Sequence, residues 1–333
     1  MKPPASPYLF LCGVPRSGTT LLQRMLNAHP ELAVTNDTHF IPRSLELVDR
    51  SFIQQAINGK EIELDQRLIE AVKSYKRFYR LGIDDAEFDW SCKHAKTYRE
   101  LVANLYATVA KRERKRLAGE KTPDYVRRVC LLHGLFPAAK LIHIIRDGRD
   151  VALSLLDWAT PNKGPGKLSL WNEHPVAVAA LWWRWFVMQW IKQASAIEPS
   201  LTHEVHYDDL IRFPKRTLEE LSQFLGLPFS PSMLDYHRGK SRIRQDNQSA
   251  KSAWLSPQKG LRDWRRDMTE SQVELFEFLA GDALVHFGFE ITDDGYSQTT
   301  RNIGQQCLDW WANHFTPKHT NATSLPPQTQ VGA

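Results

Sequence analysis

An apolar run that enters a glycine-bounded loop and continues into an amphipathic helix is the feature that most constrains this fold. The run is residues 9–12, Gly13 and Gly18 bound the loop, and the helix begins at Thr19. A strand, a loop and a helix in this order point backbone N–H groups and a positive helix end at an anion. The glycine spacing is that of a nucleoside-triphosphate P-loop, but Thr19 stands where that loop carries lysine. We therefore expect a phosphate-like group other than that of ATP or GTP, with Arg16 as the loop's cation.

Strand and helix patterns alternate along the rest of the chain. Strands are expected at residues 31–34, 140–145 and 202–207, with helices at 19–28, from 146 to 156 and at 214–225. This alternation predicts an α/β, P-loop-type three-layer fold with a mainly parallel central sheet flanked by helices. We expect one domain over residues 1–290, with a helical insertion at about 44–120 that covers the substrate. A C-terminal extension follows at 291–333, and it is expected to be disordered from about 316.

The composition favours an anionic ligand. The chain has 333 residues, 43 basic and 38 acidic, for a net charge of +5, which does not require nucleic acid as a partner. Its 4 cysteines are scattered and show neither a disulfide framework nor a zinc pattern, so a cytoplasmic location and no metal are expected. The most apolar later stretch, residues 176–191, contains Arg184 and is shorter than the roughly 20 apolar residues of a membrane span.

Two further motifs carry charge to positions where a phosphate would bind. Arg146 follows the strand expected at 140–145, and Ser154 lies about two turns into the next helix. Because the carboxyl ends of parallel strands share one sheet edge, Arg16 and Arg146 are expected to meet the same ligand. The other motif, Lys259-Gly260 before a helix, would wrap a phosphate through side chain and backbone, although a plain basic loop is an equal alternative.

These motifs resemble the sulfotransferases that use 3′-phosphoadenosine-5′-phosphosulfate, and residues 13–43 resemble the tyrosylprotein sulfotransferases most. The resemblance implies a loop for the 5′-phosphosulfate, a 3′-phosphate pair and a C-terminal Lys-Gly loop. The donor-binding residues that it implies are Arg16, Ser17, Gly18, Thr19, Thr20, Arg146, Ser154, Tyr207, Lys259 and Gly260.

The same resemblance implies catalytic roles. Asp37 stands where those enzymes have a glutamate base, and His39 is the rival base. Lys121 aligns with the lysine that meets the bridging oxygen, and Arg16 would neutralise the leaving phosphate. The structural alternatives are a turn or N-cap role for Asp37, a solvent-exposed Lys121 and an ordinary core tyrosine at 207.

The sequence departs from the tyrosylprotein sulfotransferases near the acceptor site. Thr35 stands in place of one of their cysteines, His39 in place of an arginine, and no anchor like theirs is predicted. We therefore expect sulfuryl transfer to a hydroxyl of a small molecule, lipid or glycan rather than peptidyl tyrosine, with release of adenosine 3′,5′-bisphosphate. A P-loop kinase or NTPase and a non-catalytic nucleotide-binding protein are the alternatives, and the oligomeric state, including a possible homodimer, stays open.

Overall fold

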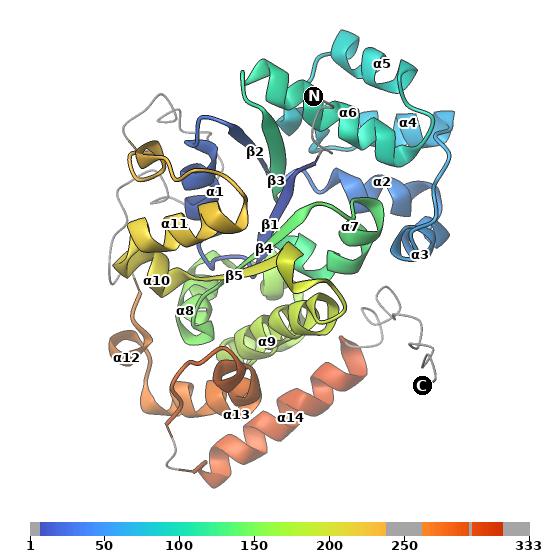
Figure 1. Ribbon diagram of the computed structural model, residues 1–333. Helices are drawn as coiled ribbons and strands as arrows, with labels where there is room; N and C mark the ends of the chain where they lie inside the picture. The colour runs from blue at the N-terminus through green and yellow to red at the C-terminus, as the bar shows by residue number, and fades with distance from the viewer. Residues whose placement is uncertain (1–6, 238–261, 293–294, 316–333) are drawn as a thin grey trace, which may run out of the picture.

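A parallel sheet forms the centre of the molecule (Figure 1). The computed structural model describes residues 7–237, 262–292 and 295–315. The strand order in the described part is β2-β3-β1-β4-β5, and every neighbouring pair is parallel, which confirms the predicted fold class. The strands are β1 (Leu9–Gly13), β2 (Leu32–Asn36), β3 (Leu117–Lys121), β4 (Lys140–Ile145) and β5 (Thr202–His206).

Helices cover both faces and the β2 edge of this sheet. The helices of the first half are α1 (Thr19–Asn27), α2 (Phe40–Val48), α3 (Ser51–Ile57), α4 (Gln66–Lys73), α5 (Asp85–Lys93), α6 (Tyr98–Arg112) and α7 (Val129–Leu135). Those of the second half are α8 (Gly148–Trp158), α9 (Pro175–Ala194), α10 (Tyr207–Arg212), α11 (Pro214–Phe224), α12 (Trp264–Asp267), α13 (Glu270–His286) and α14 (Gln298–His314).

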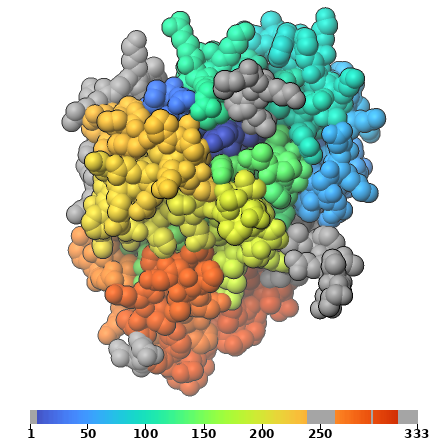
Figure 2. Space-filling view, viewed as in Figure 1, coloured from blue at the N-terminus to red at the C-terminus, as the bar shows by residue number. Residues whose placement is uncertain are grey.

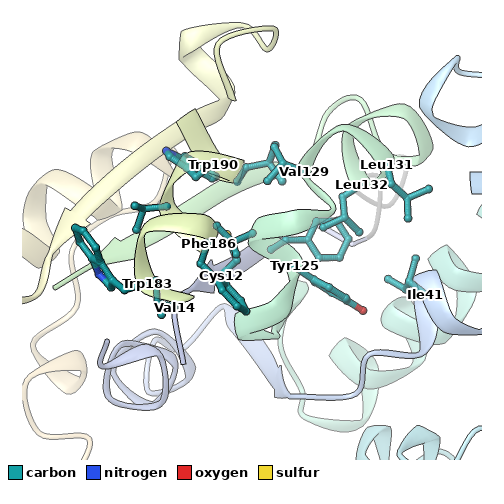
Figure 3. Close-up of a cluster of buried hydrophobic side chains, with 14 of the residues drawn as sticks. Cys12, Val14, Ile41, Tyr125, Val129, Leu131, Leu132, Trp183, Phe186 and Trp190 are labelled. Carbon is teal, nitrogen blue, oxygen red and sulfur yellow. The ribbon is translucent and has the colours of Figure 1, made fainter. Parts of the chain in front are cut away.

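The alternation of side chains along β1 creates two separate apolar cores. Leu9 and Leu11 point to the core under α1, α10 and α11. Phe10 and Cys12 point to the larger core, which α7, α8, α9 and α13 complete. Figure 3 shows part of this larger core, from Cys12 of β1 to Phe186 of α9. All β1 side chains are buried, so the strand holds the loop that follows it on a rigid base.

Side-chain caps fix where several of the covering helices begin. Asp84 before α5, Thr97 before α6 and Thr269 before α13 each form a capping box with the third residue of the helix. Each such cap stabilises its helix by about 1 kcal/mol. In Figure 2 the residues of α2 to α5, blue to cyan, lie at the upper right of the face shown, and those of α13 and α14, orange to red, lie at its lower end.

The strand predictions at β1, β2, β4 and β5 are confirmed within two residues of their ends, whereas β3 was not predicted from the sequence. Residues 44–120, expected to be helical, contain the end of α2, the helices α3 to α6 and also most of β3. Two short 3-10 turns follow later, at Gly164–Lys167 and Ser169–Asn172. Residues 316–333, expected to be disordered, lie outside the described residues.

Candidate functional site

One predicted site residue lies at or just after the carboxyl end of each of the five strands. The backbone register joins these ends: β3 pairs with β1 on one side and with β2 on the other, and Asp37 N–H donates to the Lys121 carbonyl oxygen at 2.6 Å. The structure therefore brings residues that are far apart in sequence to one sheet edge, where ligands of such folds bind. In strand order from β1 to β5 these residues are Arg16, Asp37, Lys121, Arg146 and Tyr207.

The loop after β1 packs on the ring of Tyr207. Gly18 has φ 92°, and a Cβ there would lie 2.4 Å from Cδ2 of Tyr207, so only glycine fits. The Arg146 guanidinium lies 4.5 Å from the centre of the same ring. Tyr207 therefore contacts both the loop after β1 and Arg146 after β4. This role is more specific than that of the ordinary core tyrosine considered from the sequence.

Arg16 lies at the junction of the two anion sites predicted from the sequence. It has φ 85°, in the left-handed region that is unfavourable for a non-glycine residue, and its Nε donates to Oγ of Ser154 at 2.9 Å. Burial, together with the positive charges of Arg262 and Arg146, lowers the pKa of Arg16 to about 10. Three guanidinium groups are thus gathered at this end of the sheet, and a bound anion would relieve their repulsion.

Two buried polar atoms beside this cluster have no hydrogen-bond partner within the described part of the chain. They are Oγ of Ser17, whose side chain is fully buried, and Nε of Arg146. A buried polar atom without a partner costs about 1–3 kcal/mol. The loop and the Arg146 side chain therefore fit a ligand that supplies acceptor oxygens at both places.

Residues that closely follow the Lys259-Gly260 motif in sequence lie at this site. Lys259 and Gly260 lie outside the described residues, and their role stays a prediction. Arg262 forms an ion pair with Asp157 of α8 at 2.7 Å. The Trp264 N–H donates to Asp150, whose other carboxylate oxygen accepts from Arg146. Arg262 is a site cation that the sequence analysis missed, although it stands only two residues after Gly260.

Lys121 is buried, which excludes the solvent-exposed alternative. Its side chain is 3% exposed, and its Nζ lies 3.5 Å from Oγ1 of Thr20, the second residue of α1. Burial lowers the pKa of Lys121 to about 8, although the neighbouring Asp37 carboxylate opposes this shift. The cation that the loop lacks at residue 19 is therefore supplied next to it from β3.

Asp37 accepts hydrogen bonds from three basic side chains. His39 Nε2 lies 2.8 Å from Oδ1, and Arg77 and Arg80 donate to Oδ2 at 3.2 and 2.9 Å. Burial raises the pKa of Asp37, but the hydrogen bond from His39 and the charges of Lys121 and Arg77 outweigh it, so the pKa lies well below its usual range. Arg77 and Arg80 come from a helical segment without a readable motif, and nothing in the sequence identified them.

Metal-ligand clusters and membrane spans are not found in the described part of the chain. No three His, Cys, Asp or Glu side chains gather there as a metal site would require. Within the same residues, no helix combines the length and the apolar character needed to cross a bilayer.

The parallel sheet, the glycine-bounded loop and the cations along its edge define a protein of the sulfotransferase fold. Residues 7–231 match the sulfotransferase family, and the chain belongs to this family. The family resemblance inferred from the sequence is thereby confirmed.

Individual relatives are similar over most of this chain. Protein-tyrosine sulfotransferase A of Caenorhabditis elegans is 26% identical over 239 residues, 70% of this chain and 53% of the relative. Protein-tyrosine sulfotransferase 2 of Gallus gallus is 28% identical over 237 residues, 69% of this chain and 54% of the relative. The chain thus spans about half the length of these curated relatives. The sulfotransferase domain of the Synechococcus PCC 7002 olefin synthase has a TM-score of 0.53 at 20% identity, covering 96% of both chains, and shows the shared fold.

Proposed function

We propose that this protein transfers a sulfuryl group from 3′-phosphoadenosine-5′-phosphosulfate to an acceptor hydroxyl and releases adenosine 3′,5′-bisphosphate. The observation that carries the proposal is the convergence of Arg16, Arg146 and Arg262 beside the loop after β1. A donor with a phosphosulfate at one end and a ribose 3′-phosphate at the other would add negative charge to this cluster, beside the carboxylates of Asp150 and Asp157 that already pair with Arg146 and Arg262. Oγ of Ser17 and Nε of Arg146, both buried and without a partner in the described residues, would bind its oxygens.

The chain's own residues divide between holding the donor and stabilising the leaving group. The backbone N–H groups of residues 17–20, at the start of α1, would hold the 5′-phosphate. Arg146 and Ser154, with Lys259 and Gly260, would hold the 3′-phosphate. Sulfuryl transfer, like loose phosphoryl transfer, depends mainly on alignment and on charge stabilisation, which Arg16 and Lys121 would provide.

The acceptor hydroxyl would lose its proton to Asp37, assisted by His39. The strongly lowered pKa keeps the Asp37 carboxylate ionised through the neutral range. His39 shares a hydrogen bond with it and would help to fix its orientation. The acceptor is proposed to be a hydroxyl of a small molecule, lipid or glycan, bound beside this pair.

Thermal stabilisation by nucleotides tests the donor. Adenosine 3′,5′-bisphosphate at 100 times its Kd is expected to stabilise the protein by about 2.7 kcal/mol, with ATP and GTP at the same concentration giving a much smaller shift. A shift with ATP and none with the bisphosphate would identify a kinase or NTPase instead. A shift with the bisphosphate, but no transfer to a broad panel of hydroxyl acceptors, would indicate a binding protein without catalytic activity.

Substitution of the proposed base separates the roles of Asp37 and His39. Asp37→Asn is expected to lower kcat by about 10²–10⁴-fold, because a general base contributes an acceleration of that size. His39→Ala is expected to have a smaller effect. Wild-type kcat/KM should show no acidic limb down to pH 5, since a carboxylate with a strongly lowered pKa stays ionised there. Steady-state kinetics over pH 5–9 measures both effects.

The exposed Asp49→Asn serves as the matched control and should retain full activity. The roles are reversed if Asp37→Asn stays within a few-fold of wild type while His39→Ala abolishes turnover.

A further inference from the structure

Glu120 is a fully buried carboxylate in β3, directly before Lys121. Five hydrogen bonds reach it, and every donor is neutral. Its Oε1 accepts from the Thr38 N–H at 2.8 Å, the Thr38 hydroxyl at 2.5 Å and the Thr122 hydroxyl at 2.6 Å. Its Oε2 accepts from the hydroxyl groups of Tyr106 at 2.5 Å and Tyr125 at 3.0 Å.

Stability alone does not account for a carboxylate at this place. Removing a carboxylate from water costs several kcal/mol, and hydrogen bonds repay that cost only in part. A well-packed apolar side chain at a buried strand position stabilises a protein as much or more. The arrangement around Glu120 therefore points to two roles for the carboxylate. It holds the groups that hydrogen-bond to it, and it places a negative charge in the site.

What Glu120 holds is the turn that carries the proposed base. Asp37 has φ 56° and His39 has φ 62°, both in the left-handed region that non-glycine residues adopt at a cost of about 1–2 kcal/mol each. Thr38 lies between them, and both its N–H and its hydroxyl bond to the same oxygen of Glu120. Since Thr38 is fully buried, this anchor keeps the strained turn against β3 and presents its two neighbours at the sheet edge.

The charge that Glu120 brings acts on Lys121. Asp37 and Glu120 favour the protonated form of that lysine, while Arg80 and Arg77 oppose it. The remaining titratable groups that face Glu120 are the phenols of Tyr98, Tyr106 and Tyr125, which burial and the Glu120 charge keep neutral by raising their pKa values.

We propose that Glu120 is the positioning residue of the transfer reaction. It holds the turn of Asp37 and His39 through Thr38, and from the neighbouring position of β3 its charge supports that of the Lys121 ammonium. The inference rests on the proposed function, because both groups that it serves are the proposed catalytic ones.

Glu120→Gln keeps the shape of the side chain and removes its charge. Lys121 is expected to titrate about one pH unit lower in this variant, because a nearby negative charge is lost. The titration is read by NMR from the lysine Cε resonance, assigned by its absence in Lys121→Met, and needs neither ligand nor turnover. At pH 9, above both titrations, kcat should fall about tenfold because the protonated fraction of Lys121 falls by that factor, while the Kd for adenosine 3′,5′-bisphosphate stays within about threefold.

Two matched variants separate the charge from the anchor. Tyr106→Phe removes one hydrogen bond but leaves the Glu120 charge, so the Lys121 titration should not move. Thr38→Ala removes one anchor bond and should lower kcat with the titration unchanged. An unshifted Lys121 titration in Glu120→Gln, or full kcat in Thr38→Ala, overturns the proposal.

The experiments still test the proposal if Glu120→Gln does not fold or if the wild type has no transfer activity. If Glu120→Gln does not fold, kcat of Thr38→Ala and the Lys121 titration in Tyr106→Phe decide the question. If the wild type transfers no sulfuryl group at all, the proposed function fails, whereas the lysine titration still reports whether Glu120 sets the charge of Lys121.

Discussion

Arg16→Ala is expected to lower kcat/KM by about 10³-fold, among the largest effects of any single change in this chain. An arginine that stabilises transferring phosphoryl charge contributes 10³–10⁵-fold in comparable reactions. The loss should fall mainly on kcat, since the loop amides and Arg146 still hold the donor. The wild-type residue already has φ 85°, so alanine adds no new backbone strain, and the variant should fold normally.

Steady-state kinetics and a thermal unfolding curve measure this prediction together. Arg216→Ala, in the exposed part of α11, is the control and should leave kcat unchanged. An Arg16→Ala enzyme that keeps more than a tenth of the wild-type kcat, with the control unaffected, would remove Arg16 from the reaction.

Lys121→Met is the second large prediction, with an expected loss of about 10²–10³-fold in kcat/KM. A preorganised charge beside a developing negative charge contributes on this scale in a buried site. The variant should be at least as stable as the wild type at pH 7. The pKa of about 8 lies below the 10.5 of the unfolded chain, so at neutral pH the buried ammonium lowers the free energy of unfolding, which rises between pH 8 and 10.5.

The pH profile gives this prediction a distinct signature. The protonated form of Lys121 is the active one, so wild-type kcat/KM should be level below pH 8 and fall tenfold per unit above it. Lys121→Met should lose this alkaline limb. Lys215→Met, an exposed lysine of α11, should keep it. A limb that persists unchanged in Lys121→Met would assign it to another group.

The sequence was most informative where the structure is local. The loop after β1 and the strand β4 were predicted nearly to their ends, because an apolar run followed by glycine or by a helix start is legible within about ten residues. Arg16 and Arg146 each follow a strand predicted in this way. Because parallel strands present their carboxyl ends at one edge of a sheet, both arginines were expected at that edge.

The strand β3 shows where sequence reasoning stops. Its last three residues, Gly119, Glu120 and Lys121, carry no apolar pattern, yet the strand is buried at every residue. That burial depends on hydrogen-bond partners from Thr38 and Tyr106, far away in the chain. No local pattern records such partners, so the strand was missed.

By itself, the sequence indicated the family, four of the five described strands and the glycine-bounded loop after β1, because each of these patterns lies within a short stretch of the chain. Only the tertiary structure decided that Lys121 is buried beside Thr20 and that Asp37 is held by Arg77 and Arg80. Burial and charge pairing depend on distances in space between segments that are 40 or more residues apart in the chain. These distances set the charge states of the proposed catalytic groups, and hence the pH range in which the proposed reaction is expected to proceed.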